Sequence, residues 1–119
     1  NEHGYLSYTY SERIYYQISP IIYLLRSYPN TRQAFMSVWD PNEDIDALEI
    51  DRVPCSIGYH FLIRNDKLIM IYIMRSLEIS RCLGNDLYTA SKMLEYVAEQ
   101  VGVAPGYIQF NIGSAHIFE

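Results

Sequence analysis

The sequence predicts a mixed α/β domain built on one sheet. Two apolar runs, SIGYHFLIR and KLIMIYIMR, are joined by Asn65-Asp66, a pattern typical of a β-hairpin. Further on, NDLYTASKMLEYVAEQVG carries apolar residues at helical spacing, and a further strand, GYIQFNI, follows it. Helical and strand patterns therefore follow one another along the chain, which indicates helices packed on a sheet.

The first forty residues predict one helix and one strand. From Ser11 to about Arg26, isoleucines and leucines recur at helical spacing, with Ser11 as an N-cap and Pro20 as a kink or boundary. RQAFMSVW, from Arg32 to Trp39, alternates and is rich in large side chains, so it predicts a strand. The acidic DPNEDID that follows predicts a loop.

The second half predicts a longer helix between two strands. Asn85 or Asp86 caps the start of this helix, and Gly102 closes its end. The second strand of the hairpin is apolar enough to be covered on both faces. The last strand ends at Gly113, and we expect residues 114–116 to form an exposed loop.

Length and composition favour a single cytoplasmic domain. The chain has 119 residues, 50% of them apolar, which suits one core. A net charge of -5 argues against a nucleic-acid surface. Two cysteines make neither a disulfide scaffold nor a zinc site, and no apolar stretch is long enough to span a membrane. The chain begins without Met and stops after an apolar run, so we expect a piece of a longer protein.

One cysteine stands at the entrance to a predicted strand. Cys55 follows Pro54 there, and the residues alone leave it either a buried small hydrophobe or a nucleophile. Arg75-Ser76 ends the neighbouring strand, where a guanidinium and a hydroxyl could hold a phosphate. An arginine close to a thiol also favours the reactive thiolate. Cys82 follows Arg81 in the loop expected before the second helix.

Two other polar residues have a structural and a functional interpretation. His116 could contact a sugar or a phosphate, or it could be a histidine of a loop that faces solvent. Asp86, taken alone, is most simply a helix cap.

Five stretches of the sequence, taken together and in this order, indicate one protein family: YTYSERI, YPNTRQAFMSVWDPNED, RVPCSIGYHFLI, MRSLEISRCLGND and NIGSAHIF. Together they resemble the thymidylate synthase superfamily over almost the whole chain, without a gap from Cys55 to Phe118. The resemblance implies a large mixed sheet flanked by helices, and a homodimer formed through that sheet. It also implies a single domain that lacks the family's N-terminal segment and its C-terminal tail.

The resemblance implies a role for each of these residues. Cys55 would be the nucleophile that attacks C6 of a pyrimidine nucleotide. Adding a thiolate there turns the ring into an enamine whose C5 attacks the one-carbon unit of 5,10-methylenetetrahydrofolate. The other implied site residues are Arg75 and Ser76 on the phosphate, Arg32 on the phosphate of the neighbouring subunit, Tyr10 near C5, and His116 at the sugar.

Asp86 falls where thymidylate synthases carry an asparagine that reads uracil. An amide can donate to O4 and accept from N3–H of uracil, whereas a protonated carboxyl can accept from the amino group of cytosine and donate to its N3. The resemblance is therefore greatest to the deoxycytidylate hydroxymethylase branch. A thymidylate synthase, or a nucleotide-binding relic without activity, remains the alternative.

Three residues depart from the family pattern. Gln33 replaces the second of two paired arginines, and Phe118 replaces a tyrosine whose hydroxyl meets the sugar. Glu78 stands where an aspartate near the folate is usual, one methylene longer, and we expect it to act in catalysis.

Overall fold

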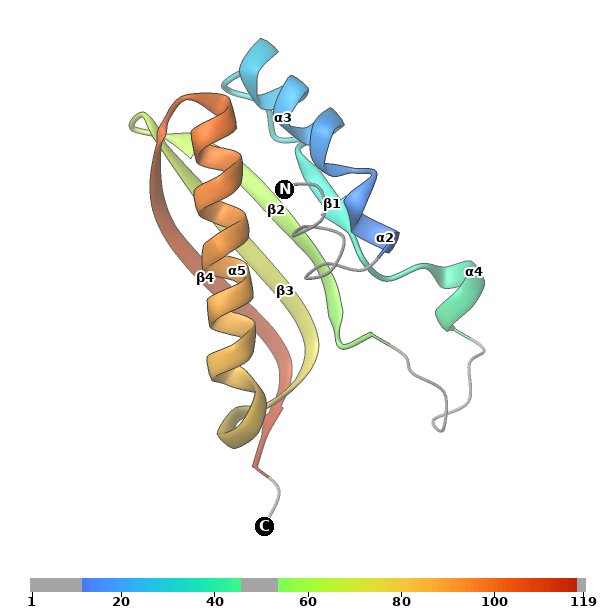
Figure 1. The fold of residues 1–119 in the computed structure, drawn as a ribbon. Helices are drawn as coiled ribbons and strands as arrows, with labels where there is room; N and C mark the ends of the chain where they lie inside the picture. The colour runs from blue at the N-terminus through green and yellow to red at the C-terminus, as the bar shows by residue number, and fades with distance from the viewer. Residues whose placement is uncertain (1–11, 46–53, 118–119) are drawn as a thin grey trace.

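The computed structural model describes residues 12–45 and 54–117. A four-stranded sheet in the order β1-β2-β3-β4 carries the two longest helices of the described residues on one side (Figure 1). The strands are β1 (Phe35–Ser37), β2 (Ser56–Arg64), β3 (Lys67–Glu78) and β4 (Ala104–His116). The helices are α2 (Glu12–Tyr15), α3 (Ile18–Ser27), α4 (Pro41–Asp44) and α5 (Ile79–Val101). The predicted mixed α/β class is confirmed.

The hairpin formed by β2 and β3 is the part of the fold that the sequence predicted most closely. The two strands are antiparallel, and the turn residues Asn65 and Asp66 have φ angles of 53° and 60°. Both lie in the left-handed region, which a two-residue hairpin turn requires and which Asn and Asp tolerate. The strand after Pro54 and the strand that ends near Arg75 are therefore neighbours, as predicted.

Helix α5 connects β3 to β4, which run parallel to each other. It begins at Ile79, so the predicted start at Asn85 or Asp86 is wrong. Leu83 packs against the core, and this tertiary contact extends the helix upstream past the exposed Gly84. The predicted end is correct, because the N–H of Gly102, with φ 93°, donates to the carbonyl of Ala98.

The first predicted helix is split into α2 and α3, and the break lies at residues 16–17 rather than at Pro20. Pro20 stands in the first turn of α3, where a missing N–H removes no helical hydrogen bond. At the break, the side-chain amide of Gln17 donates to the carbonyls of Arg13 and Ser37, both at 2.7 Å, and accepts from the N–H of Ser37 at 2.9 Å. At the break, the Gln17 side chain thus links the two helices to the backbone of β1.

Strand β1 is much shorter than the predicted strand from Arg32 to Trp39. It pairs with β2 over three residues, after which the N–H groups of Val38 and Trp39 both donate to the carbonyl of Ile57. The predicted acidic loop contains α4, because the Asp40 side chain caps its first turn by accepting from the N–H of Asn42. The predicted loop at 114–116 belongs to β4, where pairing with β3 extends the strand to His116.

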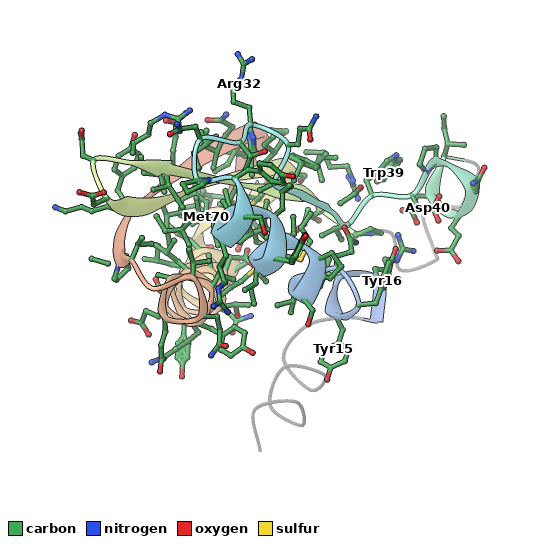
Figure 2. All side chains as sticks on the ribbon, turned by 90° about the horizontal axis from the view of Figure 1, so that it is seen from above. Tyr15, Tyr16, Arg32, Trp39, Asp40 and Met70 are labelled. Atoms are coloured by element: carbon green, nitrogen blue, oxygen red, sulfur yellow. The ribbon has the colours of Figure 1, made fainter. Side chains whose placement is uncertain are left out.

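The core lies between the sheet and the layer formed by α3 and α5. Figure 2 shows Met70 between these two layers. The fully buried side chains include Leu25 from α3, Met93 and Val97 from α5, and Phe61, Leu68 and Met70 from the sheet. On the opposite face of the sheet, Ile71 and Ile73 are half-buried and no described helix covers them. No helix of the described residues is long and apolar enough to cross a membrane.

Candidate functional site

Cys55 and Arg75 meet where β2 begins and β3 nears its end. The backbone N–H of Arg75 donates to the carbonyl of Cys55 at 2.8 Å, and Nε of Arg75 donates to the carbonyl of Pro54 at 3.0 Å. Both side chains are exposed. The structure thus brings the two predicted strand ends together, with Arg75 bonded to the backbone of Pro54 and Cys55 and with the thiol exposed.

A β-bulge follows Cys55 directly. Ser56 pairs with Met74 while Gly58 pairs with Ile73, so Ile57 is an extra residue on β2. The extra residue shifts the alternation of the strand and places Ser56 opposite Met74, a core residue. The bulge therefore turns the hydroxyl of Ser56 toward the interior, whereas the thiol of the preceding residue, Cys55, is exposed.

The side-chain hydroxyls of Tyr72 and Ser56 form a hydrogen bond with each other. Tyr72 is 3% exposed, and its ring stacks on Tyr59 with centroids 4.4 Å apart. Burial raises the pKa of Tyr72, and the negative charges of Asp86 and Cys55 raise it further, while hydrogen bonds with Ser56 and Tyr59 oppose the shift. The Tyr72 hydroxyl thus lies within electrostatic reach of two predicted site residues.

The sequence analysis missed Tyr72. The available signal was a phenol within an otherwise apolar run, KLIMIYIM, at a position that alternates toward the core. A buried Tyr hydroxyl requires a hydrogen-bond partner, and here the partner is the residue that follows Cys55.

Asp86 lies about two turns into α5 and is therefore not a helix cap. Its side chain is half-buried, and burial raises the pKa of the carboxyl above its usual value. The neutral acid consequently persists to higher pH than in an exposed aspartate. A carboxyl of this kind can both accept and donate a hydrogen bond.

Glu78 and His116 face each other across the ends of β3 and β4, where their Cα atoms are in register. Glu78 is 7% exposed, and its carboxylate accepts a hydrogen bond from the hydroxyl of Ser80 at 2.6 Å. His116 is half-buried, so the predicted exposed loop histidine is a strand residue instead. Ser76 is half-buried two pairs earlier on the same ladder, opposite Ser114.

Arg32 lies apart from these residues. Its carbonyl accepts a hydrogen bond from Nε2 of His60 at 3.0 Å, and its exposed side chain extends away from the body of the chain (Figure 2). Gln33 is also exposed. Tyr10 and Phe118 lie outside the described residues. Within this chain, Arg32 is therefore not part of the cluster around Cys55.

A second polar cluster, formed by Arg13 of α2 and Asp44 at the end of α4, escaped the sequence analysis. Arg13 forms hydrogen bonds to both carboxylate oxygens of Asp44, which is 5% exposed. These bonds hold the pKa of Asp44 below its usual value, and the same partner raises the pKa of Arg13. An open groove of about 510 Å³ borders this cluster, lined by Arg13, Trp39 and their neighbours. A groove of about 640 Å³ between α3 and α5 contains no predicted site residue.

The sequence of the chain is similar to those of known proteins. The thymidylate synthase family model matches residues 4–119. A candidate thymidylate synthase of Methanococcoides burtonii is 37% identical over 118 residues, covering 94% of this chain and 53% of that protein. Thymidylate synthase of Mycoplasma genitalium is 27% identical over 103 residues, covering 87% of this chain and 35% of that protein.

Solved structures agree with the sequence relatives. The crystal structure of thymidylate synthase from phage T4 matches with a TM-score of 0.78 and 27% identity, over 86% of this chain and 35% of that chain. The thermostable thymidylate synthase A from Bacillus subtilis matches with a TM-score of 0.75 and 23% identity, over 85% of this chain and 35% of that chain, a likeness of fold.

A mixed sheet with its longest helices on one face, superposable on a solved thymidylate synthase, thus defines a domain of thymidylate synthase type. The chain belongs to the thymidylate synthase family. It spans about half the length of the archaeal relatives it matches, 53% in the M. burtonii protein. The family and fold expected from the sequence are confirmed, whereas the individual site residues remain predictions.

We predict that Cys55 reacts faster than Cys82, although both thiols are exposed. The carbonyl of Cys55 accepts a hydrogen bond from the backbone N–H of Arg75, at the strand ends where the sequence predicts the nucleophile. Cys82 lies in α5, not in the predicted loop. Limiting iodoacetamide followed by peptide mapping should label Cys55 first, and a pyrimidine nucleotide should slow that labelling. Preferential labelling of Cys82 would overturn the assignment.

Proposed function

We propose that the protein transfers a one-carbon unit to C5 of a cytidine monophosphate and releases the 5-hydroxymethyl product. The observation that carries this proposal is Asp86, a half-buried carboxyl with a raised pKa within electrostatic reach of the same tyrosine as Cys55. Membership of the thymidylate synthase family supports the reaction class. The choice of base and product rests on Asp86.

Cys55 would start the reaction by adding its thiolate to C6 of the pyrimidine. The new S–C6 bond moves the electron pair of the C5–C6 double bond onto C5, which then becomes nucleophilic. After C5 has formed its bond to the one-carbon unit, the C5 proton would leave and the C–N bond to tetrahydrofolate would break. Water would then add to the resulting exocyclic methylene, and the thiolate would be expelled from C6, which gives the 5-hydroxymethyl nucleotide. Arg75, beside Cys55, would bind the nucleotide phosphate through its planar donors, with Ser76 next to it.

Methylenetetrahydrofolate would supply the one-carbon unit. The ends of β3 and β4 offer residues that fit it, because Glu78 is a buried carboxylate whose orientation is fixed by a hydrogen bond from Ser80. Such a carboxylate suits the N–H donors of a pterin ring. His116, in register with Glu78, would contact the sugar of the nucleotide.

Base choice would depend on the protonation of Asp86. Cytosine presents an amino donor and an N3 acceptor, so a neutral carboxyl satisfies both groups. Burial of Asp86 favours that neutral form. Uracil presents a carbonyl and an N3–H instead, and a site built for one edge rejects the other because a buried polar group loses its partner.

Two other functions compete with this one. Thymidylate synthase activity on dUMP is favoured by the names of the relatives, including that of Mycoplasma genitalium. A nucleotide-binding domain without activity is favoured by the departures at Gln33, Glu78 and Phe118.

A homodimer would complete the phosphate site. Arg32 extends away from its own chain, where a second subunit could receive it (Figure 2). The sheet face opposite the helices presents half-buried Leu62, Ile71 and Ile73, which suits a symmetric apolar contact. Sedimentation equilibrium with nucleotide present should show a dimer at micromolar concentration. A monomer under these conditions would contradict the proposal.

We predict tritium release from 5-tritiated CMP or dCMP in the presence of methylenetetrahydrofolate, without the absorbance change of dihydrofolate. The assay uses the protein with any sequence that its gene adds on either side of residues 1–119. Release from dUMP together with dihydrofolate would show a thymidylate synthase instead. No release from any of the three nucleotides would leave a binding domain without activity. Replacing Cys55 with Ala should abolish release.

Changing Asp86 to Asn should move preference from dCMP toward dUMP by about tenfold or more, because one buried polar mismatch costs about 1–3 kcal/mol. The wild type should also lose affinity for dCMP as pH rises through the raised pKa of Asp86, since the neutral acid disappears there. Calorimetric titration across that pH range, with the Asn variant as the pH-insensitive control, checks both effects. An unchanged preference would show that the base is read elsewhere.

A further inference from the structure

Trp39 lies beside the guanidinium that the proposed function assigns to the phosphate. Cζ of Arg75 is 6.0 Å from the centroid of the Trp39 ring, within the range of a cation–π contact. Nε of the same guanidinium donates to the carbonyl of Pro54 at 3.0 Å. Arg75 is thus held by an aromatic ring and by the backbone next to Cys55.

The backbone of Trp39 is fixed at both of its polar groups. Its N–H donates to the carbonyl of Ile57 at 3.2 Å, in the bulge of β2. Its carbonyl accepts a hydrogen bond from the hydroxyl of Ser37 at 3.0 Å. The indole therefore projects from a fixed point on the sheet, although β1 has already ended at Ser37.

The Arg13–Asp44 pair holds the residues on either side of Trp39. Nη1 of Arg13 donates to the carbonyl of Val38 at 3.1 Å, and a carboxylate oxygen of Asp44 accepts from the N–H of Asp40 at 2.8 Å. Figure 2 shows Trp39 and Asp40 on the segment that leaves the sheet toward α4. The ion pair thus forms hydrogen bonds with the two peptide groups that flank Trp39.

We propose that Trp39 is a positioning residue, which orients the Arg75 guanidinium for a phosphate group. The proposal rests on the proposed function in assigning the phosphate to Arg75. An arginine side chain loses much rotational freedom when it binds an anion, and a ring that already restricts the guanidinium plane reduces that loss. The Arg13–Asp44 pair would act through Trp39, by keeping the indole in place.

Trp39 is the single tryptophan of residues 1–119, so its fluorescence reports on this contact once any tryptophan that the gene adds outside these residues is replaced by Phe. We expect inorganic phosphate and dCMP to change the emission of Trp39 in a saturable way, because binding alters the charge beside the indole. Deoxycytidine, which lacks the phosphate, should not cause this change. The response should disappear in Arg75→Gln and persist in Arg64→Gln, a matched loss of charge at the other end of β2.

A second pair of variants separates positioning from packing. Trp39→Leu should weaken dCMP binding about two- to fivefold, the effect of a cation–π contact at an exposed site, and leave deoxycytidine binding unchanged. Trp39→Phe retains an aromatic face and should recover part of the loss. Calorimetric titration of both ligands gives the ratio of affinities, which a merely structural role would not change.

Two results would overturn the proposal. One is an emission that does not respond to phosphate or dCMP, or that still responds in Arg75→Gln. The other is an equal loss of dCMP and deoxycytidine affinity in Trp39→Leu. Failure of the proposed function is distinguishable, because absent tritium release with an intact Trp39 response would remove the chemistry and leave the phosphate site.

Discussion

The antiparallel pairing of β2 with β3 is the interaction on which the rest of the structure depends. It joins the backbone of Arg75 to that of Cys55, which is twenty residues away in the sequence, and so brings two strand ends with predicted site residues together. The two-residue turn at Asn65 and Asp66 sets the register of this pairing. A slip of one residue would exchange the two faces of a strand, so the site and the core share one constraint.

The bulge at the start of β2 allows one strand both to bury its core side chains and to expose the thiol of Cys55. Without an extra residue at Ile57, strict alternation would continue from the core residue Tyr59 to Cys55 and direct the thiol inward. With it, Ser56 takes the inward position opposite Met74, where its hydroxyl meets that of Tyr72. A polar pair therefore lies beneath an exposed thiol, and a buried hydroxyl gains the partner it requires.

Helix α5 and strand β4 also carry predicted site residues, Asp86 and His116. Helix α5 starts directly after Glu78, which brings Asp86 back over the end of the sheet near Tyr72. Strand β4 then returns parallel to β3 and sets His116 opposite Glu78. Residues from two strands and one helix thus converge because a helix connects two neighbouring parallel strands.

Much of this could be predicted from local patterns. Alternating apolar runs with an Asn-Asp turn predicted the hairpin, and the apolar stripe up to Gly102 predicted the end of α5. Pro54-Cys55 and Arg75-Ser76 were recognised as paired strand ends, since adjacent hairpin strands must bring such ends together. The order of five sequence blocks predicted the family, and the match over residues 4–119 confirms it.

Other features were decided by tertiary contacts that no local pattern contains. Leu83 packs on the core and moves the start of α5 upstream, which makes Asp86 a half-buried helix residue instead of a cap. The amide of Gln17 breaks the first helix by binding the edge of β1, and the ion pair of Arg13 with Asp44 fixes the segment around Trp39. The sequence by itself determined the alternation of apolar side chains and hence the sheet and its main helix. Only the tertiary structure decided which polar side chains are buried and paired, because that depends on groups far apart in the chain.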